Sequence, residues 1–164
     1  MKKQSKQTQS RKKPNKEETA AGAIVFLIEK GVIKVLLLER SDGWLEIGPK
    51  GRVKARESPI RTAHREMQEE IGIPLHIDSS FSETTRYETK DENPRTHKQY
   101  GVSKTTTYFL AFLNAHERRE IRVSEEHKSF RFVPIDEAVN LVKREVWKQA
   151  LREAKGYITR YYLT

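Results

Sequence analysis

The stretch GRVKARESPIRTAHREMQEEIG, residues 51–72, decides how this sequence folds. Ser58 followed by Pro59 is typical of a helix N-cap and first helical residue. Gly72, with Pro74 two residues later, is typical of a helix end. A helix is therefore predicted from Pro59 to Ile71. At about 100° per residue, one side of this helix is apolar and faces a core: Ile60, Ala63, Met67 and Ile71.

The neighbouring side of the same helix carries Glu66, Glu69 and Glu70, with no lysine between them. Carboxylates three or four residues apart on a helix repel each other by about 0.2–0.5 kcal/mol per pair. The sequence places no basic residue on this side to relieve the repulsion. A cation from solution would relieve it, so the pattern is open to two interpretations: a metal site or a solvated acidic surface.

The flanking sequence predicts a sheet around this helix. Residues 21–44 contain two apolar, β-branched runs separated by a Glu-Lys-Gly turn, which predicts two strands covered on both faces. Further strands are expected within 76–88, 104–114, 121–123 and 130–133, with a polar binding loop at 89–103. Helical spacing begins at Asp136. The predicted fold class is an α/β/α sandwich with a mixed β-sheet.

Composition predicts one domain from 19 to 164, preceded by a disordered basic arm at 1–18. The net charge is +9, and seven of the 32 Lys/Arg lie in residues 1–16, where no acid occurs. The arm is interpreted either as an RNA contact or as a solubilising tail. No cysteine and no apolar stretch of signal or membrane length occur, so we expect a soluble cytoplasmic protein without a membrane partner. No feature specifies an oligomeric state.

Residues 51–73 also match a known motif. Gly51, Glu57, Arg65-Glu66, Met67, Glu69-Glu70, Gly72 and Ile73 fill the positions of the Nudix box, so the sequence resembles the Nudix hydrolases. This resemblance implies a hydrolase of nucleoside diphosphates linked to another group, with Mg²⁺ or Mn²⁺ held by Gly51, Glu66, Glu69 and Glu70. It also implies that Arg65 pairs with Glu57 and fixes the loop against the helix.

Three other segments resemble asymmetrically cleaving diadenosine tetraphosphate hydrolases: GPKG at 48–51, KTTTYFLA at 104–111 and SEEHKSFRFVPIDEAVNLV at 124–142. The resemblance implies phosphate contacts from Lys50 and Lys104, adenine stacking on Tyr87, and a further metal ligand or base at Glu126. Trp44 lies farther from Pro49 than in that family, so it receives no base-stacking role. Glu66, Glu70 and Glu126 remain alternatives for the general base.

Two other functions stay open at this point. The same site would serve an RNA 5′-end pyrophosphohydrolase, acting on a cap or triphosphate, with the basic arm on the RNA backbone. A non-catalytic nucleotide or RNA sensor is disfavoured because every carboxylate of the box is present. His64 and His127 are interpreted as structural, since neither has a second histidine at ligand spacing.

Overall fold

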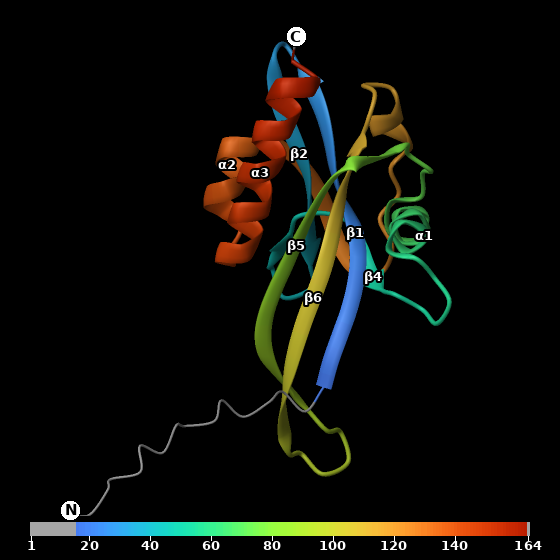
Figure 1. Ribbon diagram of the computed structural model, residues 1–164, viewed down its shortest axis with the longest axis vertical. Coiled ribbons are helices and arrows are strands. Elements are labelled where there is room, and N and C mark those ends of the chain that lie inside the picture. The colour runs from blue at the N-terminus through green and yellow to red at the C-terminus, as the bar shows by residue number, and fades with distance from the viewer. Residues whose placement is uncertain (1–15, 164) are drawn as a thin grey trace, which may run out of the picture.

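The computed structural model of the protein describes residues 16–163 (Figure 1). Its elements in chain order are β1 (Lys16–Glu29), β2 (Val32–Arg40), β3 (Leu45–Glu46), β4 (Lys50–Arg52), α1 (Pro59–Ile71), β5 (Ile77–Glu92), β6 (Gln99–Phe112), a 3-10 turn (Glu117–Glu120), β7 (His127–Pro134), α2 (Ile135–Leu141) and α3 (Glu145–Tyr161). None of the helices within residues 16–163 is both long and apolar enough to span a membrane.

The seven strands form one mixed sheet with helices on both faces. Its central order is β3-β2-β1-β6-β5, with β4 paired to β1 and β7 paired to β2. β1 and β6 run parallel, while the other pairs are antiparallel. Figure 1 shows α1 on one side of the sheet and α2 with α3 on the other. The predicted α/β/α sandwich with a mixed sheet is confirmed.

Each face of the sheet has its own apolar core, because successive side chains of a strand point to opposite faces. On β1, Ala23 and Val25 pack toward α1, where Met67 and Ile71 are buried. Ile24 and Phe26 belong to the other core, which contains Trp147 of α3. The run in β1 is therefore continuously apolar because both faces of the strand are covered, as its sequence predicted.

Helix α1 begins and ends where the sequence predicted. The Ser58 side chain accepts a hydrogen bond from the Arg61 amide at 3.3 Å, and Gly72 closes the helix with a left-handed φ of 77°. The glycine relieves the steric penalty that another residue would meet in that conformation. These two caps fix which turn of α1 carries the glutamates.

The segment between β2 and α1, which contains β3 and β4, positions the residues that precede the glutamate helix. β1 pairs with β2 only over Phe26–Glu29, and the gap beyond is filled by β3 on β2 and by β4 on β1. The backbone of Pro49 lies against β1, where its carbonyl accepts a hydrogen bond from Ala23 at 3.0 Å. A Cβ at Gly22 would lie 2.1 Å from the Pro49 carbonyl oxygen, so this close approach requires glycine.

Two expectations about chain organisation were wrong. The predicted loop at 89–103 is mostly strand, because β5 continues to Glu92 and β6 begins at Gln99, leaving a connection of residues 93–98. Backbone pairing across the hairpin outweighs the weak strand preference of its charged residues. Lys16–Glu18 are part of β1 and not of a disordered arm. The prediction for residues 1–15 lies outside the described residues.

The predicted strand at 121–123 is also absent from the described elements. This segment instead lies along the end of α1, where the Arg122 amide donates to the Ile71 carbonyl at 2.9 Å and the Ser124 amide to the Glu70 carbonyl at 3.1 Å. Its backbone groups thereby satisfy carbonyls at a helix end that would otherwise lack partners. The strand expected at Phe130–Val133 is confirmed within β7.

Candidate active site

An ion pair fastens the loop before α1 to the helix. Arg65 donates through Nε to Glu57 Oε2 and through Nη2 to Glu57 Oε1, each at 2.9 Å. Thr62 Oγ1 donates to the same carboxylate at 2.6 Å. These hydrogen bonds, led by those from Arg65, lower the pKa of Glu57 to about 2. The pairing of Glu57 with Arg65 is confirmed.

Arg65 also reaches the acidic side of the helix, which the sequence analysis described as lacking a base. Its Nη1 donates to Glu66 Oε1 at 2.6 Å and to Glu69 Oε2 at 3.3 Å. The arginine side chain is long and flexible, so it extends from its own position on the helix to the neighbouring acidic side. The position of its Cα on the helix does not reveal this contact. Arg65 therefore holds three carboxylates, two of which belong to the predicted metal set.

Gly51 makes room for one of these carboxylates. A Cβ at residue 51 would lie 2.1 Å from both Cδ and Oε1 of Glu66. Glu66 is only 8% exposed, and burial raises its pKa, while the nearby negative charges of Glu69 and Glu126 act in the same direction. The loop and the helix thus bring a backbone segment and a buried carboxylate together, as the Nudix resemblance implies.

Glu70 is the most enclosed carboxylate of the helix, at 5% exposed. Its Oε2 accepts a hydrogen bond from the Lys50 backbone amide at 3.1 Å. Burial raises the pKa of Glu70 to about 9, and the negative charges of Glu46 and Glu66 contribute to the increase. The charge of Lys50 acts in the opposite direction, but no basic side chain within residues 16–163 forms an ion pair with Glu70. A buried carboxylate in this position favours either a proton or a metal ion.

Glu126 comes from a distant part of the sequence. The segment that precedes it is hydrogen-bonded to the end of α1, and the Glu126 charge helps to raise the pKa of Glu66. Glu126 itself is exposed. The structure therefore brings Glu126 near the carboxylates of the box from a separate loop.

The donor set suits a hard divalent cation, because carboxylate oxygens and a backbone carbonyl are the ligands that Mg²⁺ and Mn²⁺ prefer. The glycine at 51 leaves the space beside Glu66 free of a side chain, and both buried glutamates have raised pKa values. Within residues 16–163, no three acidic or histidine side chains are already gathered closely enough to hold a metal ion. Arg65 pairs with Glu66 and Glu69, so a metal ion bound by these two carboxylates would compete with its guanidinium.

A buried ion pair beside the site was missed by sequence reasoning. Glu46 accepts a hydrogen bond from His127 Nε2 at 2.9 Å, and Lys50 Nζ lies 3.1 Å from its other oxygen. Burial opposes the charge on Glu46, but hydrogen bonds and charge from His127 and Lys50 hold its pKa at about 2. An acid between Leu45 and Ile47, both buried, was the available signal. His127 thus links β7 to the segment that carries Lys50.

We expect Glu46→Gln to lower the free energy of unfolding at pH 7 by up to about 3 kcal/mol, because it breaks a buried pair whose carboxyl pKa falls from 4.5 to about 2. A depressed carboxyl pKa stabilises above the unfolded value, and that stability is lost as pH falls from about 4.5 toward 2. Urea unfolding at several pH values would show the difference shrinking below pH 4.5, whereas exposed Glu88→Gln would show none. A difference independent of pH would contradict this assignment.

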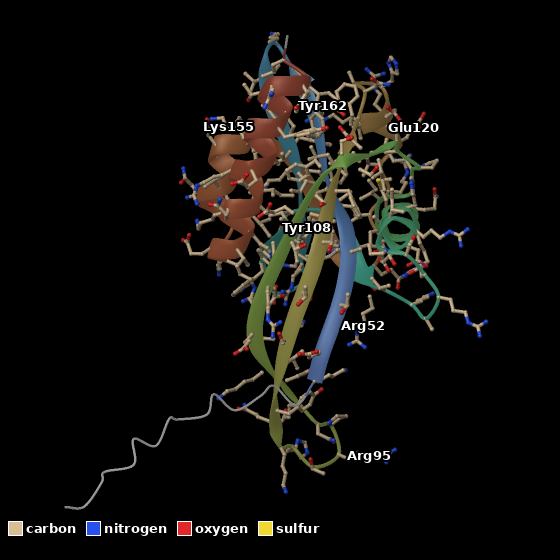
Figure 2. All side chains as sticks on the ribbon, viewed as in Figure 1. Arg52, Arg95, Tyr108, Glu120, Lys155 and Tyr162 are labelled. Carbon is tan, nitrogen blue, oxygen red and sulfur yellow. The ribbon has the colours of Figure 1, made fainter. Side chains whose placement is uncertain are left out.

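The predicted substrate residues lie on the α3 side of the sheet. Tyr87 and Lys104 are direct partners in the β5–β6 pairing, and Lys50 lies near Tyr87. Lys104 Nζ is 3.9 Å from Glu18, and its side chain is 39% exposed. Tyr108, which Figure 2 places on the sheet, is buried, and its hydroxyl has no hydrogen-bond partner among residues 16–163. The structure therefore brings Lys50, Tyr87 and Lys104 to one surface.

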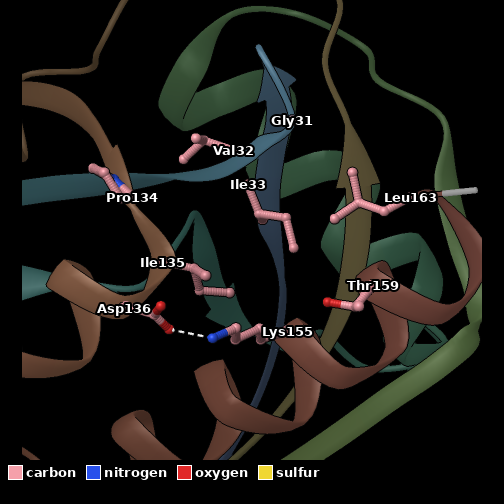
Figure 3. A pocket seen from close by; sticks show the side chains of 9 residues that line it. All are labelled: Gly31, Val32, Ile33, Pro134, Ile135, Asp136, Lys155, Thr159 and Leu163. Carbon is pink, nitrogen blue, oxygen red and sulfur yellow. Dashed lines mark hydrogen bonds and ion pairs between the residues drawn. The ribbon is translucent and has the colours of Figure 1, made fainter.

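A separate cavity of about 250 Å³ lies at the C-terminal end of α3 (Figure 3). Its lining comes from the β1–β2 turn, the start of α2 and the end of α3, with the Asp136–Lys155 ion pair across it at 2.7 Å. No lining residue belongs to α1 or to the loops that carry the glutamates. The cavity is therefore distinct from the candidate active site.

The fold and the carboxylate site define the class of protein. A model of the NUDIX domain matches residues 16–154, and the chain belongs to the Nudix family. It is a Nudix hydrolase, an enzyme that acts on phosphoanhydride bonds.

Its similarity to particular enzymes extends over most of the chain. It is 32% identical to an asymmetrical bis(5′-nucleosyl)-tetraphosphatase of Rattus norvegicus over 151 residues, 85% of this chain and 94% of the rat protein. A crystal structure of a C. elegans Ap4A hydrolase binary complex superposes with a TM-score of 0.74 at 26% identity, covering 88% of this chain and 99% of that one. An RNA pyrophosphohydrolase of Halorhodospira halophila is 30% identical over 121 residues, 67% of this chain and 66% of that protein.

Proposed function

We propose that this Nudix hydrolase cleaves dinucleoside tetraphosphates asymmetrically, converting diadenosine tetraphosphate and water to ATP and AMP with Mg²⁺ or Mn²⁺. The observation that carries the proposal is the near-full-length similarity to the rat enzyme, which covers 94% of that protein. A match of this extent includes the elements outside the box that carry Lys50, Tyr87, Lys104 and Glu126. Those elements, rather than the box, distinguish one Nudix substrate from another.

We assign the metal ions to Glu66, Glu69, Glu70 and Glu126, with the carbonyl of Gly51. A divalent ion bound there would neutralise the diphosphate and lower the pKa of the attacking water. Glu57 and Arg65 act indirectly, since their pairing keeps the loop of Gly51 against α1. Glu66, Glu70 and Glu126 remain the three carboxylates from which a general base would come.

The remaining residues of the site would bind and orient the substrate. Lys50 and Lys104 lie on different strands and present ammonium groups to the phosphate chain. Glu46 outweighs the effect of burial and raises the pKa of Lys50, so this lysine stays charged. Tyr87, the cross-strand partner of Lys104, offers an aromatic ring to the adenine. A chain of four phosphates is long enough to use both lysines.

We expect Lys104→Met to reduce kcat/KM on diadenosine tetraphosphate about 10-fold, or about 1.4 kcal/mol, and to affect ADP-ribose far less. The shorter diphosphate would be held by the metal ions and Lys50 without reaching Lys104. Lys90→Met, farther out on the same hairpin, is the matched control and should change neither rate. Equal losses on both substrates would contradict the role of Lys104.

Product analysis tests the proposal itself. The wild-type enzyme should give ATP and AMP, with oxygen from labelled water in only one product, and EDTA should abolish turnover. Two molecules of ADP would contradict asymmetric cleavage, while activity unaffected by EDTA would contradict the metal assignment.

A second candidate is hydrolysis at an RNA 5′ end, which the similarity to the RNA pyrophosphohydrolase of Halorhodospira halophila favours. The basic residues before Lys16 would add contacts with the RNA backbone, and such contacts weaken with salt. Triphosphorylated RNA belongs in the same substrate panel. A higher kcat/KM on that RNA than on diadenosine tetraphosphate would select this second function.

A further inference from the structure

Three aromatic side chains from distant parts of the sequence meet beside Lys50 and Lys104. Trp44 follows β2, Tyr87 lies on β5 and Trp147 lies on α3. The ring centroids of Trp44 and Trp147 are 6.5 Å apart, and those of Tyr87 and Trp147 are 6.1 Å apart, both in edge-to-face arrangements. Trp44 and Tyr87 are half-buried, so parts of both rings remain at the surface.

Arg144 lies among these rings. Its guanidinium carbon is 3.7 Å from the centroid of Tyr87, 5.0 Å from that of Trp44 and 5.4 Å from that of Trp147. Arg144 comes from the short connection between α2 and α3, where it is the N-cap residue of α3. The aromatic faces attract the cation and fix its position.

Two hydrogen-bond donors of this cluster have no acceptor within residues 16–163. The first is the buried Nε of Arg144. The indole Nε1 of Trp147, a residue only 1% exposed, also lacks an acceptor. Both groups only donate hydrogen bonds. Buried donors without acceptors are unusual in folded proteins, so the cluster lacks a partner that accepts hydrogen bonds.

The position of the cluster indicates which part of a ligand would reach it. Tyr87 is the strand partner of Lys104 and is close to Lys50, the two lysines assigned to the phosphates. A nucleotide whose phosphates contact these lysines would place its base beside Tyr87 and Arg144. The edge of the base would then face the guanidinium of Arg144.

We propose that Arg144 is a base-specificity residue that makes the enzyme prefer guanine over adenine in its dinucleoside tetraphosphate substrate, an inference that rests on the proposed function. The guanidinium presents parallel N–H donors from its end. Guanine offers two acceptors, N7 and O6, on one edge, whereas adenine offers N7 beside an amino group that donates. Adenine would therefore place a donor against a donor, and guanine would not.

The test compares kcat/KM on diguanosine and diadenosine tetraphosphate for the full-length enzyme with Mg²⁺. We expect the wild type to prefer the guanine substrate at least 10-fold, equivalent to about 1.4 kcal/mol. Arg144→Gln should bring this ratio to within about twofold, and Arg144→Lys should do the same, because lysine keeps the charge but loses the planar fork. Lys143→Gln is the matched control, since this exposed neighbour also lies over Trp44, at 4.8 Å, and should leave the ratio unchanged.

The outcomes separate this inference from the proposed function. A wild-type ratio near one, or a ratio that survives both Arg144 substitutions, overturns the role of Arg144 while leaving the hydrolase assignment intact. If neither substrate is cleaved, the proposed function fails, and binding of GDP and ADP then decides. Tryptophan fluorescence quenching measures both dissociation constants. In the wild type the constant for GDP should be at least 10-fold lower than that for ADP, and in Arg144→Gln the two should be equal. Equal affinities in the wild type overturn the inference.

Discussion

Glu70→Gln should reduce kcat on diadenosine tetraphosphate by at least about 10³-fold, or about 4 kcal/mol, without unfolding the protein. Glutamine keeps an oxygen that accepts the Lys50 amide hydrogen bond, so the local backbone contact survives. It cannot carry the negative charge that a divalent ion requires. Steady-state kinetics with Mg²⁺ measures the loss, and Glu120→Gln, an exposed change away from the site, is the control.

The same variant has a distinct pH dependence of stability in EDTA. A folded-state pKa of about 9 means that Glu70 keeps its proton when the unfolded chain has lost it, so stability falls as pH rises from 4.5 to about 9. Glu70→Gln removes this decline, whereas Mg²⁺ should stabilise the wild type most at high pH, where it no longer competes with the proton. Thermal unfolding at pH 6 and pH 9 checks both effects. Unchanged turnover in Glu70→Gln would contradict the site.

Gly51→Ala should abolish at least about 99% of turnover, or about 2.7 kcal/mol in the barrier, while changing the free energy of unfolding by less than about 1 kcal/mol. The added methyl would lie 2.1 Å from the Glu66 carboxylate, so the carboxylate has to move. It is the flexible end of a side chain, and its displacement therefore costs little stability. The same displacement removes a proposed metal ligand from beside the loop.

Two other glycines provide matched comparisons for this variant. In Gly156→Ala the new methyl would meet no atom of residues 16–163 within 4 Å beyond its chain neighbours and the adjacent backbone of its own helix. The helix should gain up to about 1 kcal/mol with no change in activity. In Gly22→Ala the methyl meets the Pro49 backbone at 2.1 Å, which cannot yield as a side chain does, so stability should fall. Denaturant unfolding and kinetics on the three variants would distinguish loss of the site from loss of the fold. Wild-type activity in Gly51→Ala would contradict the proposed metal site between Gly51 and Glu66.

Local sequence signals were sufficient to predict the elements that begin and end at capping or turn residues. Ser58 and Gly72 cap α1 at both predicted ends, and the apolar runs on either side of Gly31 form β1 and β2. Residues 89–103 were mistaken for a loop because polar and charged side chains predominate there and leave no clear period-two apolar pattern. Pairing between β5 and β6, a tertiary effect, makes most of this segment strand.

The amino-acid sequence by itself determined the family, the helix and the carboxylates, because capping residues, apolar spacing and the Nudix box all act within about 20 residues. It also predicted the pair of Glu57 with Arg65, which lie on adjoining elements. Only the tertiary structure decided which distant groups meet. His127 contacts Glu46, which lies 81 residues earlier in the sequence, and Arg144 lies over Tyr87 and Trp44. These contacts depend on strand order and on the packing of α3, and no local pattern encodes them. The general features of the chemistry follow from short-range sequence, whereas the partners of each charge follow from the fold.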